Sequence, residues 1–345
     1  MFKLKRRSGR RTAQDLFDLF SAIAENWRRR AEAESGDDAS VCCYVRAAGF
    51  DTPEKVAAMR AHYEHWLAHV PGLEGSIGCD LGCWRGFSTA TQAALGCALV
   101  YGVDPIESSI VHAEQWRTQF GVDNIRFRAM RAGIVPLSND SVDWVIINQV
   151  FCNALPESFS NSLREAHRIL KEGGQLLFSD ANNPYCPAAL ERLRDNFRQN
   201  EIGDGTLAQP NGPNYRARLS MIQRHRPELA EEEARRLARE TCYLYGDQIK
   251  HAVDAYLASG QAPASAFVPG SLRPTCVPGT GASNGNLTDP YALCAELRSI
   301  GFETPQISCS PRFSVLDNEA LWEQLQVSQG FFVFAKKAKQ ERGGG

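Results

Sequence analysis

A glycine-containing turn with an acidic residue before it stands out in the stretch CDLGCWRGFST, residues 79–89. Gly82 and Gly86 let the backbone approach a ligand where a Cβ atom would collide with it. Asp80 lies at the end of a short apolar run, two residues before Gly82, so we expect its carboxylate to face whatever the turn binds. A carboxylate repels a pyrophosphate and attracts a cationic group. The turn therefore favours a ligand with positive charge over a dinucleotide.

A second acidic residue follows the next apolar run. Asp104 ends the stretch LVYGVD, about 24 residues beyond Asp80. An acid at that place accepts hydrogen bonds from both ribose hydroxyls of an adenosine, whether it belongs to NAD or to S-adenosylmethionine. By itself, GVDP is also good turn chemistry. The combination of Asp104 with Asp80 and Gly82 predicts S-adenosylmethionine as the cofactor and S-adenosylhomocysteine as its product.

Polar residues also follow the fifth apolar run, in the stretch DANNPY, residues 180–185. Asp180 is the carboxylate at this place that could take a proton, and Asn182 and Asn183 could orient a polar acceptor by hydrogen bonds. The same residue types form turns, so they are equally well explained as the entry into the next segment. Asp180, Asn182 and Asn183 are the candidate catalytic residues.

These residues depend on a regular alternation of elements between residues 76 and 181. Short apolar runs alternate there with helix-length stretches, which is typical of βαβ units and predicts a parallel sheet buried on both faces. The runs are SIGCDLG, ALVYGVD, NIRFRAM, VDWVIINQV and GGQLLFSDA. Further along, we expect a helix from its N-cap Asp289 to Gly301. Two strand-like runs follow, at 305–311 and 330–337, as a closing hairpin or its equivalent.

The segments outside this alternation divide the chain further. Residues 1–72 are predicted to be a helical leader that serves as a lid or a dimer element. Residues 73–181 and 289–338 form the expected cofactor-binding core. Residues 182–288 are mostly helical and form an insertion after the fifth strand, at the carboxyl edge where such sheets bind ligands. This predicts a cap over the substrate; a peripheral decoration is the alternative.

The composition excludes several classes of partner. The 345 residues are 43% hydrophobic, which is enough for a sizeable core. The 38 basic and 40 acidic residues nearly balance, so neither a nucleic acid nor a membrane is expected as a partner. The basic run KLKRRSGRR, residues 3–11, is either a solvated terminus or an arm for an anionic surface. No apolar run has the length of a signal peptide or a transmembrane helix.

The cysteines and histidines do not predict a metal site. The 11 cysteines form no paired CxxC sets, which suits reduced, mostly buried thiols in a cytoplasmic protein without structural zinc. His62, His65 and His69 could share one helix face. No carboxylate or cysteine completes the set from sequence, so we expect a solvated helix flank.

Residues 76–180 resemble the class I S-adenosylmethionine-dependent methyltransferases. DLGCWRG resembles the D/E-x-G-x-G-x-G signature of that family, and YGVDP resembles its acidic loop. VPLSNDSVDWVIINQVFCNALP resembles the stretch before and through its fourth strand, and SLREAHRILKEGGQLLFSDANN its next helix, glycine turn and fifth strand. The resemblance implies an α/β fold, namely a Rossmann-like, seven-stranded, mostly parallel sheet with helices on both faces.

The resemblance also implies which residues contact the cofactor, position by position. They are Asp80, Gly82, Cys83, Trp84 and Gly86 at the methionine half, Asp104 at the ribose, Pro105 beside the adenine, Met130, Arg131 and Ala132 at the adenine edge, and Asn148, Gln149 and Val150 beneath the sulfonium and its methyl group.

Two positions depart from the pattern of the family. Trp84 replaces the central glycine, which is tolerable if its φ is negative or if its side chain packs outward over the amino acid end of the cofactor. Arg131 stands where the family often has an acid that accepts from the adenine amino group, and arginine has no acceptor. Adenine is then expected to be held by backbone groups and by apolar contact with Met130 or Ile106.

The predicted function is methyl transfer from S-adenosylmethionine to a small or medium-sized acceptor by in-line displacement. A sugar, a glycan or a secondary metabolite is the favoured acceptor. Two alternatives stay open: an NAD-dependent oxidoreductase on the same fold, and a non-catalytic S-adenosylmethionine-binding protein, prompted by Trp84 and Arg131. A homodimer is also left open.

Overall fold

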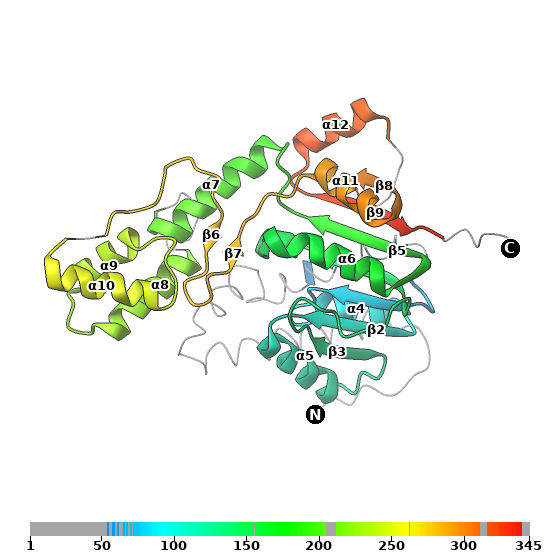
Figure 1. Cartoon of the computed structure of the whole chain (residues 1–345), viewed down its shortest axis with the longest axis horizontal. Coiled ribbons are helices and arrows are strands. Elements are labelled where there is room, and N and C mark those ends of the chain that lie inside the picture. The colour runs from blue at the N-terminus through cyan, green and yellow to red at the C-terminus, as the bar shows by residue number, and fades with distance from the viewer. Residues whose placement is uncertain are drawn as a thin grey trace.

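The structure is a computed structural model, and its fold is drawn in Figure 1. It describes single positions between residues 54 and 70, and then residues 72–154, 156–204, 212–261, 263–310 and 316–339. Apart from those single positions, the predicted leader and its basic run lie outside the described residues.

A seven-stranded sheet forms the centre of the fold (Figure 1). The strand order is β3-β2-β1-β4-β5-β9-β8, in which β1 to β5 are parallel and β9 is antiparallel to both β5 and β8. The strands are β1 (Ile77–Leu81), β2 (Leu99–Asp104), β3 (Ile125–Ala129), β4 (Val142–Asn148), β5 (Leu170–Asp180), β8 (Phe302–Ser308) and β9 (Phe331–Lys337). The predicted α/β fold with a mostly parallel seven-stranded sheet is confirmed.

Helices pack on both faces of the sheet, and β4 shows why the apolar runs are continuous. Trp144 and Ile146 belong to the core cluster on one face, whereas Val145 and Ile147 belong to the cluster on the other, and all four are at most 1% exposed. Successive strand residues point to opposite faces, so a strand covered on both sides needs consecutive apolar residues. The covering helices are α4 (Phe87–Ala94), α5 (Glu107–Gln119), α6 (Phe159–Ile169), α11 (Pro290–Ile300) and α12 (Asn318–Val327).

The end of the chain differs from a simple hairpin. Strands β8 and β9 do pair in antiparallel fashion, but α12 lies between them in the sequence. The side chain of Asp317 caps α12 by accepting from the backbone N–H of Ala320 at 2.8 Å. Leu321 and Leu325 of α12 are buried in the core, four residues apart on one helix face. The helix forms because this apolar pair has a place to pack.

The segment after β5 forms a mostly helical insertion, as predicted. Figure 1 shows its helices beyond the carboxyl end of β5. They enclose a small core of their own, which includes Tyr215, Ile222, Leu237 and Val253. Across the described residues, no helix combines the length and the apolar character that crossing a bilayer requires. The elements of the insertion are α7 (Pro187–Ile202), α8 (Pro213–His225), α9 (Glu231–Glu240), α10 (Asp247–Ser259) and the hairpin strands β6 (Thr275–Cys276) and β7 (Ser283–Asn284).

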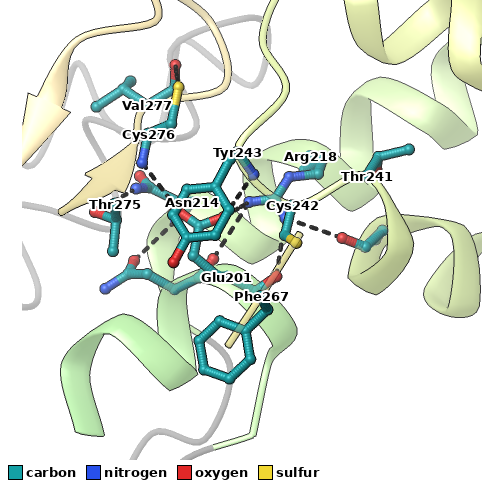
Figure 2. Close-up of polar contacts among 12 residues, drawn as sticks. Glu201, Asn214, Arg218, Thr241, Cys242, Tyr243, Phe267, Thr275, Cys276 and Val277 are labelled. Carbon is teal, nitrogen blue, oxygen red and sulfur yellow. Dashed lines mark hydrogen bonds and ion pairs between the residues drawn. The ribbon is translucent and has the colours of Figure 1, made fainter. Parts of the chain in front are cut away.

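A buried ion pair joins the elements of the insertion (Figure 2). Arg218 of α8 lies 2.9 Å from the carboxylate of Glu201 of α7, and both side chains are 0% exposed. Arg218 also donates to the carbonyl of Ala238 at 3.0 Å. The Glu201 carboxylate accepts from the backbone N–H of Tyr243 at 2.9 Å and of Cys276 at 3.0 Å. The pair therefore links two helices, the end of α9 and the hairpin strand β6.

Removing one partner leaves the other charge buried without its counter-ion, which costs about 3–5 kcal/mol. Glu201→Gln and Arg218→Met are each expected to lower the free energy of unfolding by about that amount, measured by urea denaturation followed by circular dichroism. Arg198→Ala is the control, because its ion pair with Asp204 is exposed, with side-chain accessibilities of 47% and 60%. The control should lose about 1 kcal/mol or less. Equal losses at the buried and the exposed pair would contradict the structural role.

Candidate functional site

The turn between β1 and α4 requires glycine at two positions. Gly82 and Gly86 have φ of 81° and 88°, in the left-handed region that glycine adopts without steric cost. A Cβ atom on Gly82 would collide with the side chain of Val150, and one on Gly86 would collide with the ring of Phe127. Both signature glycines thus allow a close approach of the backbone. Val150 is thereby placed against the turn.

Asp104 reaches the same turn from the end of β2. Its Oδ2 accepts from the backbone N–H of Trp84 and its Oδ1 from that of Ile106, both at 2.8 Å. Burial raises the pKa of Asp104, and the two backbone hydrogen bonds oppose that change. An ionised carboxylate has about four lone-pair sites. Each oxygen therefore retains capacity for one ribose hydroxyl.

Asp80 lies within β1, and its buried carboxylate is hydrogen-bonded to the first turn of α4. Its Oδ1 accepts from the Ser88 hydroxyl at 3.2 Å and its Oδ2 from the Thr89 hydroxyl at 2.6 Å. Burial raises its pKa to about 6, and the two hydroxyls oppose that rise. The sequence analysis did not single out Ser88 and Thr89, although two hydroxyl residues in the first turn of a helix after an acid are a usable signal. The negative charge remains next to the turn.

Trp84 keeps the backbone conformation of the glycine that it replaces. Its φ is 50°, so the first of the two conditions, a negative φ, is not met. The indole is half-buried against the core cluster that contains Phe87 and Trp116, and the guanidinium carbon of Arg85 lies 5.7 Å from the ring centroid. The neighbouring Cys83 is buried, with its thiol 3.7 Å from the Trp84 carbonyl. Packing of the indole holds a backbone conformation that costs about 1–2 kcal/mol in a residue with a Cβ.

Two further predicted cofactor residues share this backbone conformation. Ala132 follows β3 with φ of 51°, and Gln149 follows β4 with φ of 53°. Non-glycine residues in the left-handed region cluster at ligand sites, where the surrounding structure holds them in place. Together with Trp84, they mark the ends of three strands at the same edge of the sheet.

The residues predicted for the adenine lie at the ends of β2 and β3. The backbone N–H of Met130 donates to the Asp104 carbonyl at 2.9 Å, which joins the two strand ends. Pro105 and Arg131 are exposed, and Ile106 has 53% of its surface exposed although it is apolar. An exposed isoleucine at this place suits apolar contact with a base, as expected for a site without an acidic acceptor.

The residues predicted to lie beneath the sulfonium are hydrogen-bonded to β5. Asn148 Oδ1 accepts from the Ser179 hydroxyl at 2.6 Å, and the backbone N–H of Gln149 donates to the Ser179 carbonyl at 2.8 Å. The end of β4 is therefore fixed beside the end of β5. Contacts between these residues and a cofactor remain predictions.

Asp180 is buried at the end of β5, with 3% of its surface exposed. Its Oδ1 accepts from the backbone N–H of Asn182 and its Oδ2 from the Thr288 hydroxyl, both at 3.0 Å. Burial raises the pKa of Asp180 to about 6. Cys152, in the short 3-10 helix η1 (Phe151–Asn153), lies beside it, and burial and the Asp180 charge raise the pKa of its thiol. This arrangement gives a carboxylate that is ionised near neutral pH and basic enough to take a proton.

Asn182 and Asn183 are both buried but lie in different surroundings. Asn182 donates from Nδ2 to the Asn286 carbonyl at 3.0 Å, close to Asp180. Asn183 donates from Nδ2 to the carbonyls of Leu325 and Ser328, at 2.6 Å and 2.8 Å. Both N–H groups of the Asn183 side chain are thus used to anchor the turn to the C-terminal end of α12. The geometry favours the turn interpretation for Asn183 over the catalytic one.

Asn286 and Thr288 are functional candidates that the sequence analysis missed. They lie in a segment rich in proline, glycine and polar residues, which predicted only a loop. Their partners Asn182 and Asp180 are 104 and 108 residues away in the chain. A hydrogen bond between residues so far apart in the chain leaves no signal in the local sequence pattern.

Two other features lie away from this edge of the sheet. A hollow of about 390 Å³ is lined by residues such as Glu74, Asp143 and Lys171, at the amino ends of β1 and β4, and none of the predicted cofactor residues lines it. Within the described part of the chain, no group of three or more His, Cys, Asp or Glu residues could hold a metal ion. Of the three histidines considered from sequence, only His65 is described.

The strain at Trp84 can be measured by comparing two variants that both lose the indole. Trp84→Gly is expected to be more stable than Trp84→Ala by about 1 kcal/mol, because glycine adopts positive φ freely. Urea denaturation of the two proteins measures the difference. Ala255→Gly on an exposed position of α10 is the control and should destabilise by about 1 kcal/mol. An alanine variant as stable as the glycine variant would show that the turn relaxes to a negative φ.

Comparison with known proteins identifies a domain family in part of the chain. Residues 74–244 match the model of a methyltransferase domain family. An arsenite methyltransferase from Aquipseudomonas alcaligenes is 33% identical over 139 residues, which are 38% of this chain and 38% of that protein. A ubiquinone biosynthesis O-methyltransferase from Pseudomonas fluorescens is 29% identical over 121 residues, 35% of this chain and 51% of that protein. The chain thus spans no more than about half the length of these relatives.

A solved structure of an S-adenosylmethionine-dependent methyltransferase from Mesorhizobium loti is also similar. It shares 15% identity with a TM-score of 0.41, over 79% of this chain and 95% of that one. The residues that match the family model contain β1 to β5, the turn after β1 and Asp104. Through these residues the chain carries a methyltransferase domain that resembles the class I S-adenosylmethionine-dependent methyltransferases.

Proposed function

We propose that this protein transfers the methyl group of S-adenosylmethionine to a small or medium-sized acceptor held between the sheet and the insertion. The observation that carries the proposal is the hydrogen bond from the Trp84 N–H to Asp104 Oδ2 at 2.8 Å, because it brings the ribose-binding carboxylate against the glycine turn. A sugar, a glycan or a secondary metabolite is the favoured acceptor. The names of the two relatives refer to arsenite and to ubiquinone biosynthesis, so similarity does not select an acceptor for this chain.

The residues at this edge fit S-adenosylmethionine. Asp104 has acceptor capacity for a ribose diol, and Gly82 keeps the turn free of a side chain. Ile106 offers an exposed apolar surface for the adenine. The ionised carboxylate of Asp80 lies behind the turn and favours a cation there. The same charge disfavours the pyrophosphate of NAD.

The reaction requires the protein mainly to align the acceptor with the methyl group. S-adenosylmethionine, when bound, would supply an electrophilic methyl group and a neutral thioether as the leaving group. The acceptor forms the new bond to carbon and must lose a proton if it attacks through a hydroxyl. Asp180 receives that proton, and solvent takes it in turn. Asn182 orients the acceptor, and burial of both residues keeps water from the reacting atoms.

Calorimetry with S-adenosylmethionine, S-adenosylhomocysteine and NAD tests the cofactor assignment. The first two are expected to bind and NAD is not. Asp104→Ala should weaken binding by about 1.5–3 kcal/mol, the scale of hydrogen bonds to a charged group. Asp123→Ala, an exposed position before β3, is the control and should change nothing. Preferential NAD binding would favour the oxidoreductase, and unchanged affinity in Asp104→Ala would remove the ribose assignment.

A screen of sugars, glycans and secondary metabolites with radiolabelled methyl donor tests turnover and the role of Asp180. Asp180→Asn should lower kcat by roughly 10²–10⁴-fold while S-adenosylhomocysteine binds as before. In the wild type, kcat should rise with pH through about 6, because only ionised Asp180 accepts a proton. Glu191→Gln, exposed on α7, is the control for a charge change nearby. Cofactor binding without turnover across the panel would favour a non-catalytic protein.

A further inference from the structure

The chain returns from the insertion to the sheet through residues 285–288, here called the return limb. The backbone N–H groups of Gly285 and Asn286 both donate to the Cys152 carbonyl, at 2.6 Å and 3.1 Å. The Asn286 side chain donates from Nδ2 to the carbonyls of Phe151 and Ala154, at 3.0 Å and 2.6 Å. The return limb therefore holds the loop that follows β4.

The return limb is also bonded to the end of β5. Its Thr288 hydroxyl donates to Asp180 Oδ2 at 3.0 Å, and its Asn286 carbonyl accepts from the Asn182 side chain at 3.0 Å. Asp180, Asn182, Asn286 and Thr288 are each at most 6% exposed. One short segment of the insertion thus completes the surroundings of both strand ends at which the acceptor is proposed to react.

The position of the return limb is set by the body of the insertion. Strand β6 is bonded to Glu201 through the Cys276 N–H, and Figure 2 shows this contact beside the buried Arg218. Gly285 has φ of 94°, and a Cβ atom there would collide with the Phe197 ring of α7. The return limb thus passes close over α7 on its way to the sheet.

The surroundings of Asp180 differ from those of the other buried carboxylate, Glu201. Glu201 has an arginine as its partner, whereas the groups that hydrogen-bond to Asp180 are neutral: the Thr288 hydroxyl and the backbone of Asn182, Ala181 and Cys152. In the described part of the chain, Cys152 of η1 and Arg192 of α7 lie beside this turn, and Asp289 reaches it by accepting from the Tyr185 hydroxyl at 2.9 Å. The Arg192 guanidinium donates to the Ala181 carbonyl at 3.1 Å and to Asn182 Oδ1 at 3.3 Å.

We propose that Thr288 is a positioning residue, which holds the Asp180 carboxylate in the orientation in which it receives the proton of the acceptor. The insertion then does more than cover the substrate, because its return limb supplies a hydrogen-bond partner to the base. The inference rests on the proposed role of Asp180. The acceptor class that it implies is a compound that attacks through a hydroxyl, since a base is needed there.

The test measures the pKa of Asp180 directly, by NMR titration of protein labelled with ¹³C at the aspartate carboxyls. Asp180→Asn identifies its signal. Thr288→Val keeps the shape of the side chain and removes the donor, so the Asp180 pKa should rise by about one unit, because a hydrogen bond to the ionised form lowers a pKa. Thr288→Ser keeps the donor and should restore the wild-type value. Thr118→Val, at an exposed position of α5, is the control for replacing a threonine by a valine.

The same variants separate this inference from the proposed function. With an acceptor found in the screen, the acid limb of the pH profile of kcat in Thr288→Val should move to higher pH together with the Asp180 pKa. Affinity for S-adenosylhomocysteine should stay unchanged. An unchanged Asp180 pKa would overturn the inference, whatever the acceptor. A raised pKa with an unmoved acid limb would support the contact and overturn the role of Asp180 as base. If Thr288→Val does not fold, Thr288→Ala gives the same comparison.

Discussion

The contact between the turn after β1 and the carboxylate at the end of β2 is the constraint on which the site depends. Asp104 accepts from the Trp84 N–H, so the end of β2 and the turn between β1 and α4 are held at one point. The contact requires the turn to pass close to β4, where a side chain on Gly82 would meet Val150. It also requires a left-handed backbone at Trp84, which packing of the indole maintains. The proposed cofactor site is thus built from backbone positions more than from side chains.

Buried carboxylates have two different roles in this fold. Glu201 is matched by Arg218 and accepts two backbone hydrogen bonds, which makes it a cross-link within the insertion. Asp180 accepts hydrogen bonds from a hydroxyl and a backbone N–H, and burial raises its pKa to about 6. A charge satisfied by neutral donors is easier to protonate than one held by an arginine. Burial raises the pKa of Glu201 as well, but there the Arg218 charge opposes the rise, whereas neutral donors oppose it at Asp180. This difference in partners suits one carboxylate to a structural role and the other to the proposed proton transfer.

The insertion connects these two roles. Its helices pack around their own apolar core, and the hairpin leads from the Glu201 ion pair toward the sheet. The return limb then reaches the ends of β4 and β5 within a few residues. A segment that begins as an excursion from a common α/β sheet therefore ends as part of the proposed acceptor site. Closure over a substrate and the setting of the base would be coupled through this one path.

The sequence alone determined the sheet and predicted the cofactor edge, because these follow from local patterns. Continuous apolar runs such as VDWVIIN report strands buried on both faces, and Asp80, Gly82 and Asp104 lie at strand ends at characteristic spacing. Helix α12 escaped prediction although Leu321 and Leu325 show helical spacing, since so short a helix forms only where that pair is buried. The sequence pattern also did not predict the hydrogen bonds of Asp80, the positive φ of Trp84 or the anchoring role of Asn183. Only the tertiary structure decided that Thr288 meets Asp180, because the path of the chain brings together residues that are 108 positions apart.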